Sequence, residues 1–156
     1  MPLTNDHAAL KNRIDSFSAG GWTSGHIGLA WAWYLISPEW SNVWPAESEP
    51  VVYKDGKTIK AVILMTDGNF NTAYANGESA DQAQQLCDAM RDNDKQIIVF
   101  SVAFQAPGAA RALLQNCSSP SNGMIEQTYF NAGNGQELEN AFKTIAIQLN
   151  NLRLAY

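Results

Sequence analysis

The run Ala61-Val62-Ile63-Leu64-Met65 decides the fold of this chain. Every position in it is apolar, and it is bounded by Lys60 on one side and by Thr66-Asp67-Gly68 on the other. Strands in the middle of a parallel sheet are covered on both faces, and they show this kind of continuous apolar pattern. The run therefore predicts a central strand of a parallel sheet that is buried on both faces.

Strand and helix signals alternate after this run. A second apolar run at 97–104 predicts another buried strand, and residues 125–130 predict a weaker one. Apolar residues at helical spacing predict helices over 78–93, from Pro107 onward, and over 138–152. Such alternation is typical of an α/β domain with a parallel sheet, and 156 residues is the size of one domain.

The residues before the first strand are less regular. A helix is expected before Gly20-Gly21, and an almost wholly apolar stretch predicts a well-buried helix over 27–36. Residues 37–58 contain three prolines and two tryptophans, so they predict a long loop or insertion. Within this loop, residues 51–53 are expected to form a short extended segment.

Charge and cysteine content limit the possible classes of protein. The net charge of −5 argues against a basic nucleic-acid surface and against attraction to anionic lipid. No nucleic-acid partner is therefore expected. The two cysteines, Cys87 and Cys117, lack the spacing of a zinc site. Their positions alone allow either two buried thiols or one disulfide.

Two polar loops lie where α/β proteins bind ligands. In open α/β sheets the ligand site is at the carboxyl ends of the strands. Asp67 follows the first strand, and Thr23 lies in the glycine-rich loop that precedes the helix at 27–36. A carboxylate and a hydroxyl are oxygen ligands of the kind that Mg²⁺ prefers. By residue type alone, however, Asp67 in a turn and Thr23 as a helix cap are the favoured roles, because Asp-Gly turns and threonine caps are very common.

The pattern as a whole resembles the von Willebrand factor type A domain. Within that superfamily it is most similar to the domain of bacterial Tad/Flp pilus-assembly proteins of the TadG type. The segments that carry the resemblance are Leu3-Thr4 with Leu10 and Ile14, 21–29, 31–38, Trp44-Pro45, 62–72, the two cysteines, and 131–146. The resemblance implies a Rossmann-like, three-layer α/β fold with a mainly parallel sheet.

The resemblance also implies a metal-ion-dependent adhesion site. Such a site takes its ligands from a D-x-S-x-S loop, a threonine and an aspartate, and the last two match Thr23 and Asp67. No D-x-S-x-S occurs in the chain. The chain is therefore expected to be a single, partial domain over residues 1–156 that lacks the family's N-terminal strands, including the D-x-S-x-S strand. Mg²⁺ or another divalent cation is expected to bind weakly or not at all.

The family further implies where the protein works and with what. It implies an extracytoplasmic location, in the periplasm or cell envelope, with a membrane anchor in an N-terminal segment outside this chain. It implies a protein partner from a pilus or secretion machinery. A disulfide between Cys87 and Cys117 would suit the oxidising surroundings of an exported protein.

Three functions follow from these residues. The first is a non-catalytic, protein-binding or adhesion-type module with a partial metal site. The alternatives are a metal-assisted phosphoryl-transfer enzyme that uses Asp67, and a metal-free structural assembly subunit. Phosphoryl chemistry calls for a second nearby carboxylate, and position 69 is Asn69. The binding module is therefore the preferred hypothesis.

Five tryptophans lie within one 23-residue window. Trp22, Trp40 and Trp44 are a possible partner surface, because aromatic residues are enriched at binding hot spots. Trp40 and Trp44 could equally fasten the long loop, and Trp31 is expected in the core. The two histidines, His7 and His26, are expected at the surface or at helix starts.

The absence of the family's first strands predicts an open sheet edge at the 61–65 strand. An unpaired strand invites association. We expect either a homodimer, or swapped sheet, through this edge, or a substitute strand from residues 51–53 that covers it.

Overall fold

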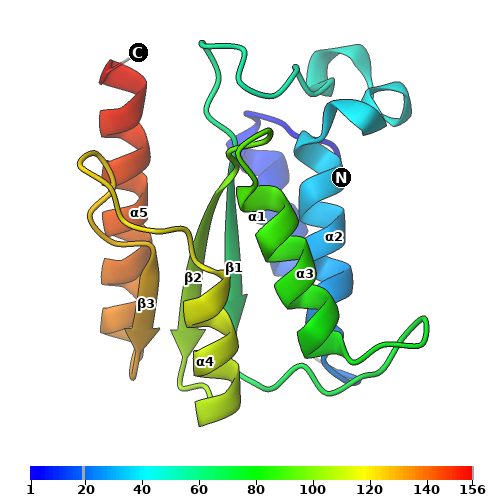
Figure 1. Cartoon of the computed structure of the whole chain (residues 1–156), viewed down its shortest axis with the longest axis vertical. Coiled ribbons are helices and arrows are strands. Elements are labelled where there is room, and N and C mark those ends of the chain that lie inside the picture. Colours follow the sequence, from blue (N-terminus) through cyan, green and yellow to red (C-terminus); the bar gives the residue numbers. More distant parts are fainter. Residues whose placement is uncertain (19, 156) are drawn as a thin grey trace.

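The computed structural model describes residues 1–18 and 20–155. Its sheet contains three parallel strands in the order β1-β2-β3 (Figure 1). The strands are β1 (Ala61–Thr66), β2 (Ile98–Phe104) and β3 (Tyr129–Ala132). This confirms the predicted α/β architecture with a parallel sheet. The last strand begins at Tyr129 instead of residue 125, because Ile125 is buried in the loop before it.

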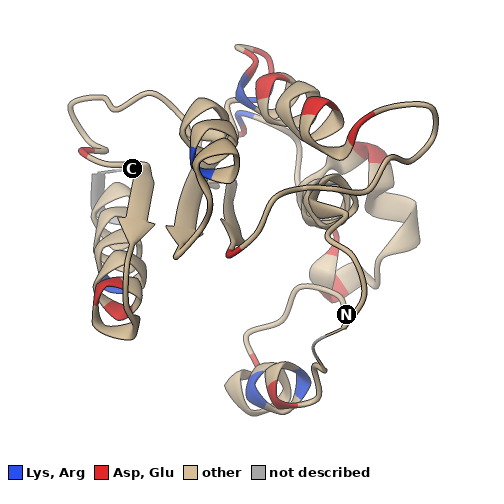
Figure 2. Cartoon of the chain, turned by 90° about the horizontal axis from the view of Figure 1, so that it is seen from below, with Lys and Arg blue, Asp and Glu red and all other residues tan. Residues whose placement is uncertain are grey.

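Helices cover both faces of this sheet. The α-helices are α1 (His7–Asp15), α2 (Gly25–Ile36), α3 (Ser79–Arg91), α4 (Gly108–Cys117) and α5 (Gly135–Ala155). Parallel strands need crossover connections, and α3 and α4 supply them between β1, β2 and β3. Figure 2 shows α3 and α4 on one side of the sheet and α5 on the other. This three-layer arrangement is compatible with a Rossmann-like fold.

Each face of the sheet has its own hydrophobic cluster. The larger cluster lies under α2, α3 and α4 and includes Val62, Leu64, Val99, Ala103 and Leu114. The smaller one lies under α5 and includes Phe100, Val102, Phe130, Ala141 and Ile145. Alternate residues of β2 enter opposite clusters, as strand geometry requires. β2 is thus the central strand.

A disulfide joins the last turn of α4 to α3. Cys87 and Cys117 are bonded, with their Cα atoms 5.1 Å apart and with both residues fully buried. The predicted pairing is confirmed. The bond fastens two helices on the same face of the sheet, inside the larger cluster.

β1 is buried on only one face, which corrects the prediction of a fully buried strand. Val62 and Leu64 are 5% and 8% exposed, whereas Ile63 and Met65 are 41% and 42% exposed. Within the described residues β1 pairs with β2 alone, so its other edge is free. An apolar run shows that both faces of a strand can be buried, but it does not show that a helix covers each of them.

The expected insertion at 37–58 contains two short 3₁₀ helices, at Pro38–Val43 and Ala46–Ser48. The substitute strand expected at 51–53 does not form. Val51 and Val52 are exposed, and the carbonyl oxygen of Val51 accepts a hydrogen bond from Lys60 Nζ at 2.7 Å.

The same buried ammonium of Lys60 donates to the carbonyl oxygen of Ile36 at 2.6 Å. One side chain therefore ties the end of α2 to Val51, within the insertion. Burial lowers the pKa of Lys60, and the charges of Asp55 and Glu39 oppose that shift.

The first two helices are more exposed than the sequence predicts. Only His26 and Leu29 of α2 are buried, and Trp31, expected in the core, is 52% exposed. α1 begins after the N-cap Asp6 and has no buried residue. Within the described residues no layer covers the outer side of either helix, and hydrophobic content alone could not reveal this. None of the helices in the described part of the chain is long and apolar enough to cross a membrane.

Candidate functional site

The loops that carry Thr23 and Asp67 meet at the carboxyl end of β1. The Thr23 N–H donates to Asn71 Oδ1, and the Asn71 N–H donates to the Thr23 carbonyl oxygen, both at 3.1 Å. A Cβ placed on Gly68 would lie 3.9 Å from Thr23 Oγ1, so the hydroxyl sits beside the residue that follows Asp67. The structure thus brings the two predicted loops together, as the strand-end rule suggested.

The polar groups around Asp67 already serve the backbone. Thr66 Oγ1 accepts from the Gly68 N–H at 3.2 Å and donates to the Gly68 carbonyl oxygen at 3.0 Å. Asn69 Oδ1 accepts from the N–H of Ala110, in the first turn of α4, at 3.1 Å. Asn69 is therefore a cap for α4, a role that its position in the sequence did not reveal.

These residues do not fit a resident divalent cation. Mg²⁺ prefers six oxygen ligands, with one or two carboxylates among them. Asp67 and Thr23 offer one exposed carboxylate and one hydroxyl. Within the described part of the chain, no group of three or more His, Cys, Asp or Glu residues could hold a metal ion.

A groove runs between α2 and the open side of β1. It encloses about 260 Å³, and its α2 wall consists of Gly25, Gly28, Leu29 and Ala32. A Cβ on Gly25 would lie 2.0 Å from the ring of Phe70, which therefore closes one end of the groove. A Cβ on Gly28 would meet no atom within 4 Å. The groove thus has an open wall of small residues beside the free strand edge.

The predicted tryptophan surface is divided between the two ends of α2. Trp22 precedes the helix and is 82% exposed. Trp40 follows the helix and stacks on Tyr34, with ring centroids 3.9 Å apart. Trp44 Nε1 donates to the Tyr34 carbonyl oxygen at 2.8 Å. Because a 12-residue helix spans about 18 Å, Trp22 does not join the other two in one surface.

Trp40 and Trp44 instead fasten the insertion to α2. The exposed Trp31 also contacts Trp40, with centroids 6.4 Å apart. This arrangement matches the alternative in which Trp40 and Trp44 hold the long loop in place. Trp22 lies at the other end of α2, next to Thr23.

His26 lies at a helix start, as predicted, but its contact with α3 was not indicated by the sequence. It is the second residue of α2 and is buried, and its Nδ1 lies 2.6 Å from Ser79 Oγ at the start of α3. Of the two positions expected for His26, a helix start or the surface, the structure has the helix start. His7 begins α1 and is exposed.

Comparisons of the chain with protein-family models, curated proteins and solved structures find no match.

Proposed function

We propose that this chain is a non-catalytic, protein-binding module whose binding element is the free edge of β1. The observation that carries the proposal is the contrast along one strand: Val62 and Leu64 are buried, but Ile63 and Met65 are exposed beside an unpaired edge. Exposed apolar edge strands are templates for pairing with another chain. Natural proteins use this pairing for recognition, with main-chain hydrogen bonds supplying affinity.

The backbone of β1 is oriented for such pairing. The Ile98 N–H donates to the carbonyl oxygen of Lys60 at 3.0 Å, so the even-numbered residues of this segment face β2. Because successive residues of a strand direct their hydrogen-bonding groups to opposite sides, Ala61, Ile63 and Met65 direct theirs to the free edge. An incoming strand could satisfy these groups and cover the two exposed side chains.

A second copy of the chain is the partner that can be tested directly. A two-fold axis at Leu64 would pair two β1 strands in antiparallel fashion. It would place Ile63 opposite Met65 of the second copy, and the reverse, on the same face. Each exposed apolar side chain would then meet another across the interface.

The resemblance to TadG-type von Willebrand A domains gives this module a biological setting. It favours a partner from a pilus or secretion machinery, and a place in the periplasm or cell envelope. The Cys87–Cys117 disulfide supports an oxidising compartment. The single carboxylate at the strand end favours binding without a metal, and it offers little to a phosphoryl-transfer enzyme.

Sedimentation velocity at micromolar concentrations tests the proposal. The wild-type chain is expected to populate a dimer, and Ile63→Lys is expected to weaken dimerisation at least tenfold because a charged residue blunts a strand edge. Ile147→Lys is the matched control, since Ile147 is an exposed isoleucine on α5, away from β1. A monomeric wild type, or equal weakening by both variants, would contradict edge pairing between copies.

A further inference from the structure

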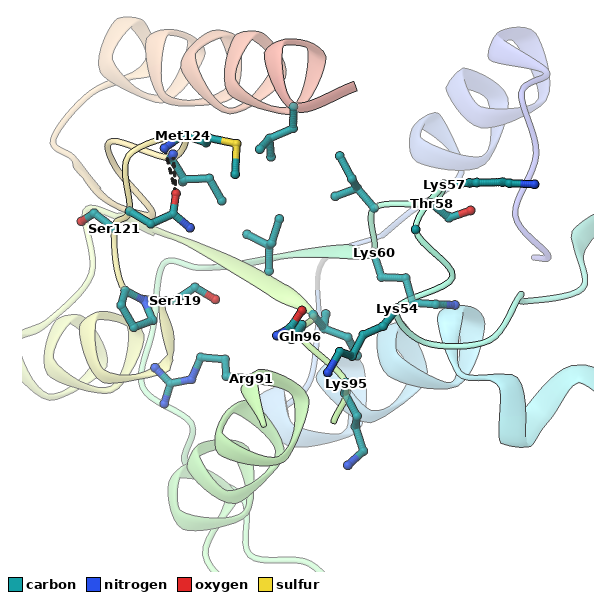
Figure 3. A pocket seen from close by; sticks show the side chains of 18 residues that line it. Lys54, Lys57, Thr58, Lys60, Arg91, Lys95, Gln96, Ser119, Ser121 and Met124 are labelled. Atoms are coloured by element: carbon teal, nitrogen blue, oxygen red, sulfur yellow. Dashed lines mark hydrogen bonds between the residues drawn. The ribbon is translucent and has the colours of Figure 1, made fainter. Parts of the chain in front are cut away.

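A second cavity lies at the amino end of the sheet, opposite the end that carries Thr23 and Asp67. It encloses about 520 Å³ and is formed by the loop before β1, the end of α3, the start of β2 and the loop before β3. In Figure 3, Lys54, Lys57 and Lys60 lie on one side, and Arg91 and Ser119 lie on the other. A volume of this size is typical of pockets for small ligands.

Basic residues are concentrated around this cavity. Although the chain carries a net charge of −5, five of its ten lysines and arginines are among the described residues that line the cavity, and none of those described lining residues is an aspartate or a glutamate. The five are Lys54, Lys57, Lys60, Arg91 and Lys95. Such a local excess of positive charge creates a potential that attracts anions.

Much of this charge is not neutralised by carboxylates. Lys60 Nζ and Lys54 Nζ donate to backbone carbonyl oxygens, the latter to that of Asn93 at 2.9 Å. Lys95 Nζ lies 5.8 Å from the centroid of the Trp33 ring. Among the described residues, only Arg91 of the five forms a salt bridge, and its partner is Asp88. An ammonium has three protons to donate, so Lys54 Nζ, with one acceptor, keeps donors for a ligand, whereas Lys60 Nζ already has two acceptors.

Two carboxylates in the segments before β1, those of Asp55 and Glu39, have hydrogen-bond partners of their own. Asp55 accepts hydrogen bonds from the N–H groups of Lys57 and Thr58 and from the Thr58 hydroxyl. Glu39 accepts from the hydroxyls of Ser37 and Tyr53. Neither residue lines the cavity.

The interior of the cavity is apolar. Six hydrophobic residues line it: Ile59, Ile97, Ile98, Ile125, Met124 and Leu152. Ile125 and Leu152 belong to the hydrophobic cluster under α5, and Ile59 and Ile98 pack against that cluster. A ligand in this cavity would therefore meet hydrocarbon inside and positive charge around it.

Two residues that line the cavity have an unusual backbone conformation. Lys54 and Gln96, two of the lining residues, have φ angles of 54° and 52°. Such left-handed conformations cost energy for residues other than glycine, and they gather at ligand sites.

We propose that this cavity binds a small amphipathic anion, with a carboxylate or sulfonate head and an apolar body. The basic side chains receive the head, and the isoleucine-rich interior receives the body. This site is separate from the edge of β1 and does not depend on the proposed protein-binding function.

Methyl NMR of isoleucine-labelled protein, titrated with decanoate below its micelle concentration, locates the site. We expect saturable shifts at Ile59, Ile98 and Ile125, with none at Ile63 or Ile147. Decanol tests the apolar body alone and inorganic phosphate tests the charge alone, and each is expected to bind at least tenfold more weakly. Shifts centred on Ile63, or no shifts, would overturn the proposal, as would equal affinity for decanol or for phosphate.

A charge variant tests the role of the lysines. Lys54→Gln/Lys95→Gln is expected to weaken decanoate binding about tenfold, since each exposed cation contributes modestly. The matched control is Lys11→Gln/Lys143→Gln, which removes the same charge at exposed positions outside the cavity. Equal weakening in both variants would mean that only the overall charge matters and would overturn the assignment of the head group to this cavity.

Discussion

On one face of the sheet, α2, α3 and α4 cover strand residues of β1, β2 and β3, whereas on the other face α5 covers β2 and β3 and leaves Ile63 and Met65 exposed. The covered face also contains the disulfide between α3 and α4. The difference separates two roles within one small sheet. The face under three helices stabilises the domain, and the half-bare face beside β1 is the surface that we propose for a partner.

The disulfide should have the largest effect of any feature on the covered face. Replacing both Cys87 and Cys117 with alanine removes a cross-link between residues 30 positions apart. By the loop-entropy relation, the free energy of unfolding should fall by about 3 to 4 kcal/mol. Urea denaturation measures the loss. A loss below about 1 kcal/mol would show that packing alone holds α3 to α4.

Two neighbouring residues of β1 compare the faces directly. Leu64→Ala should lower the free energy of unfolding by about 3 kcal/mol, because it leaves a cavity under the three helices. Ile63→Ala, one residue away and on the bare face, should cost about 1 kcal/mol, since its side chain is already 41% exposed. The same urea titrations measure both. Equal losses would mean that the bare face is covered in solution, and a repeat at tenfold lower protein concentration would identify self-association as the cause.

Magnesium tests whether the carboxyl end beside the bare face is already a complete metal site. With one carboxylate and one hydroxyl available, a dissociation constant above 1 mM is expected, so 1 mM Mg²⁺ should stabilise the chain by less than about 0.4 kcal/mol. Thermal unfolding with and without Mg²⁺ measures this. A larger effect that disappears in Asp67→Asn would establish a complete site in this chain.

The smallest expected effect is on stability at acid pH and comes from the insertion. The insertion contacts the covered side of the sheet through α2. The hydrogen bond from the Ser37 hydroxyl lowers the pKa of Glu39 below its ordinary value of about 4.5. A carboxyl group with a lowered folded-state pKa adds stability above its unfolded pKa, and that stability is lost as pH falls through the folded pKa. Glu39→Gln should therefore flatten the decline in stability below about pH 4.5. Identical acid unfolding curves for both proteins would exclude this contribution.

Sequence patterns predicted the sheet and its crossovers well. The apolar runs that became β1 and β2, and the amphipathic pattern of α3 with Cys87 on its inner face, depend on local period and composition. The meeting of the Thr23 and Asp67 loops followed from a rule about parallel sheets together with the resemblance to the von Willebrand A domain. These features were predictable because the information they need lies within a few neighbouring residues or in the topology.

The features that the sequence did not predict depend on which surfaces are covered by other parts of the chain. Ile63 and Trp31 are exposed because, among the described residues, no other element covers them. The hydrophobicity of a side chain does not indicate whether another element covers it. The burial of His26 depends on Ser79, which is 53 residues away. The cavity at the amino end assembles lysines from two turns, and only the spacing of Lys54, Lys57 and Lys60 before β1 could have suggested it.

The clamp formed by Lys60 has a practical consequence for protein engineering. Since its ammonium holds the carbonyls of Ile36 and Val51, the ends of the 37–50 segment are fixed whatever lies between them. The entropy of closing a loop rises slowly with length, by about 0.6 kcal/mol for each doubling. Exposed positions such as Asn42 and Val43 are therefore suitable points for grafting a foreign peptide, which the domain would display as a constrained epitope.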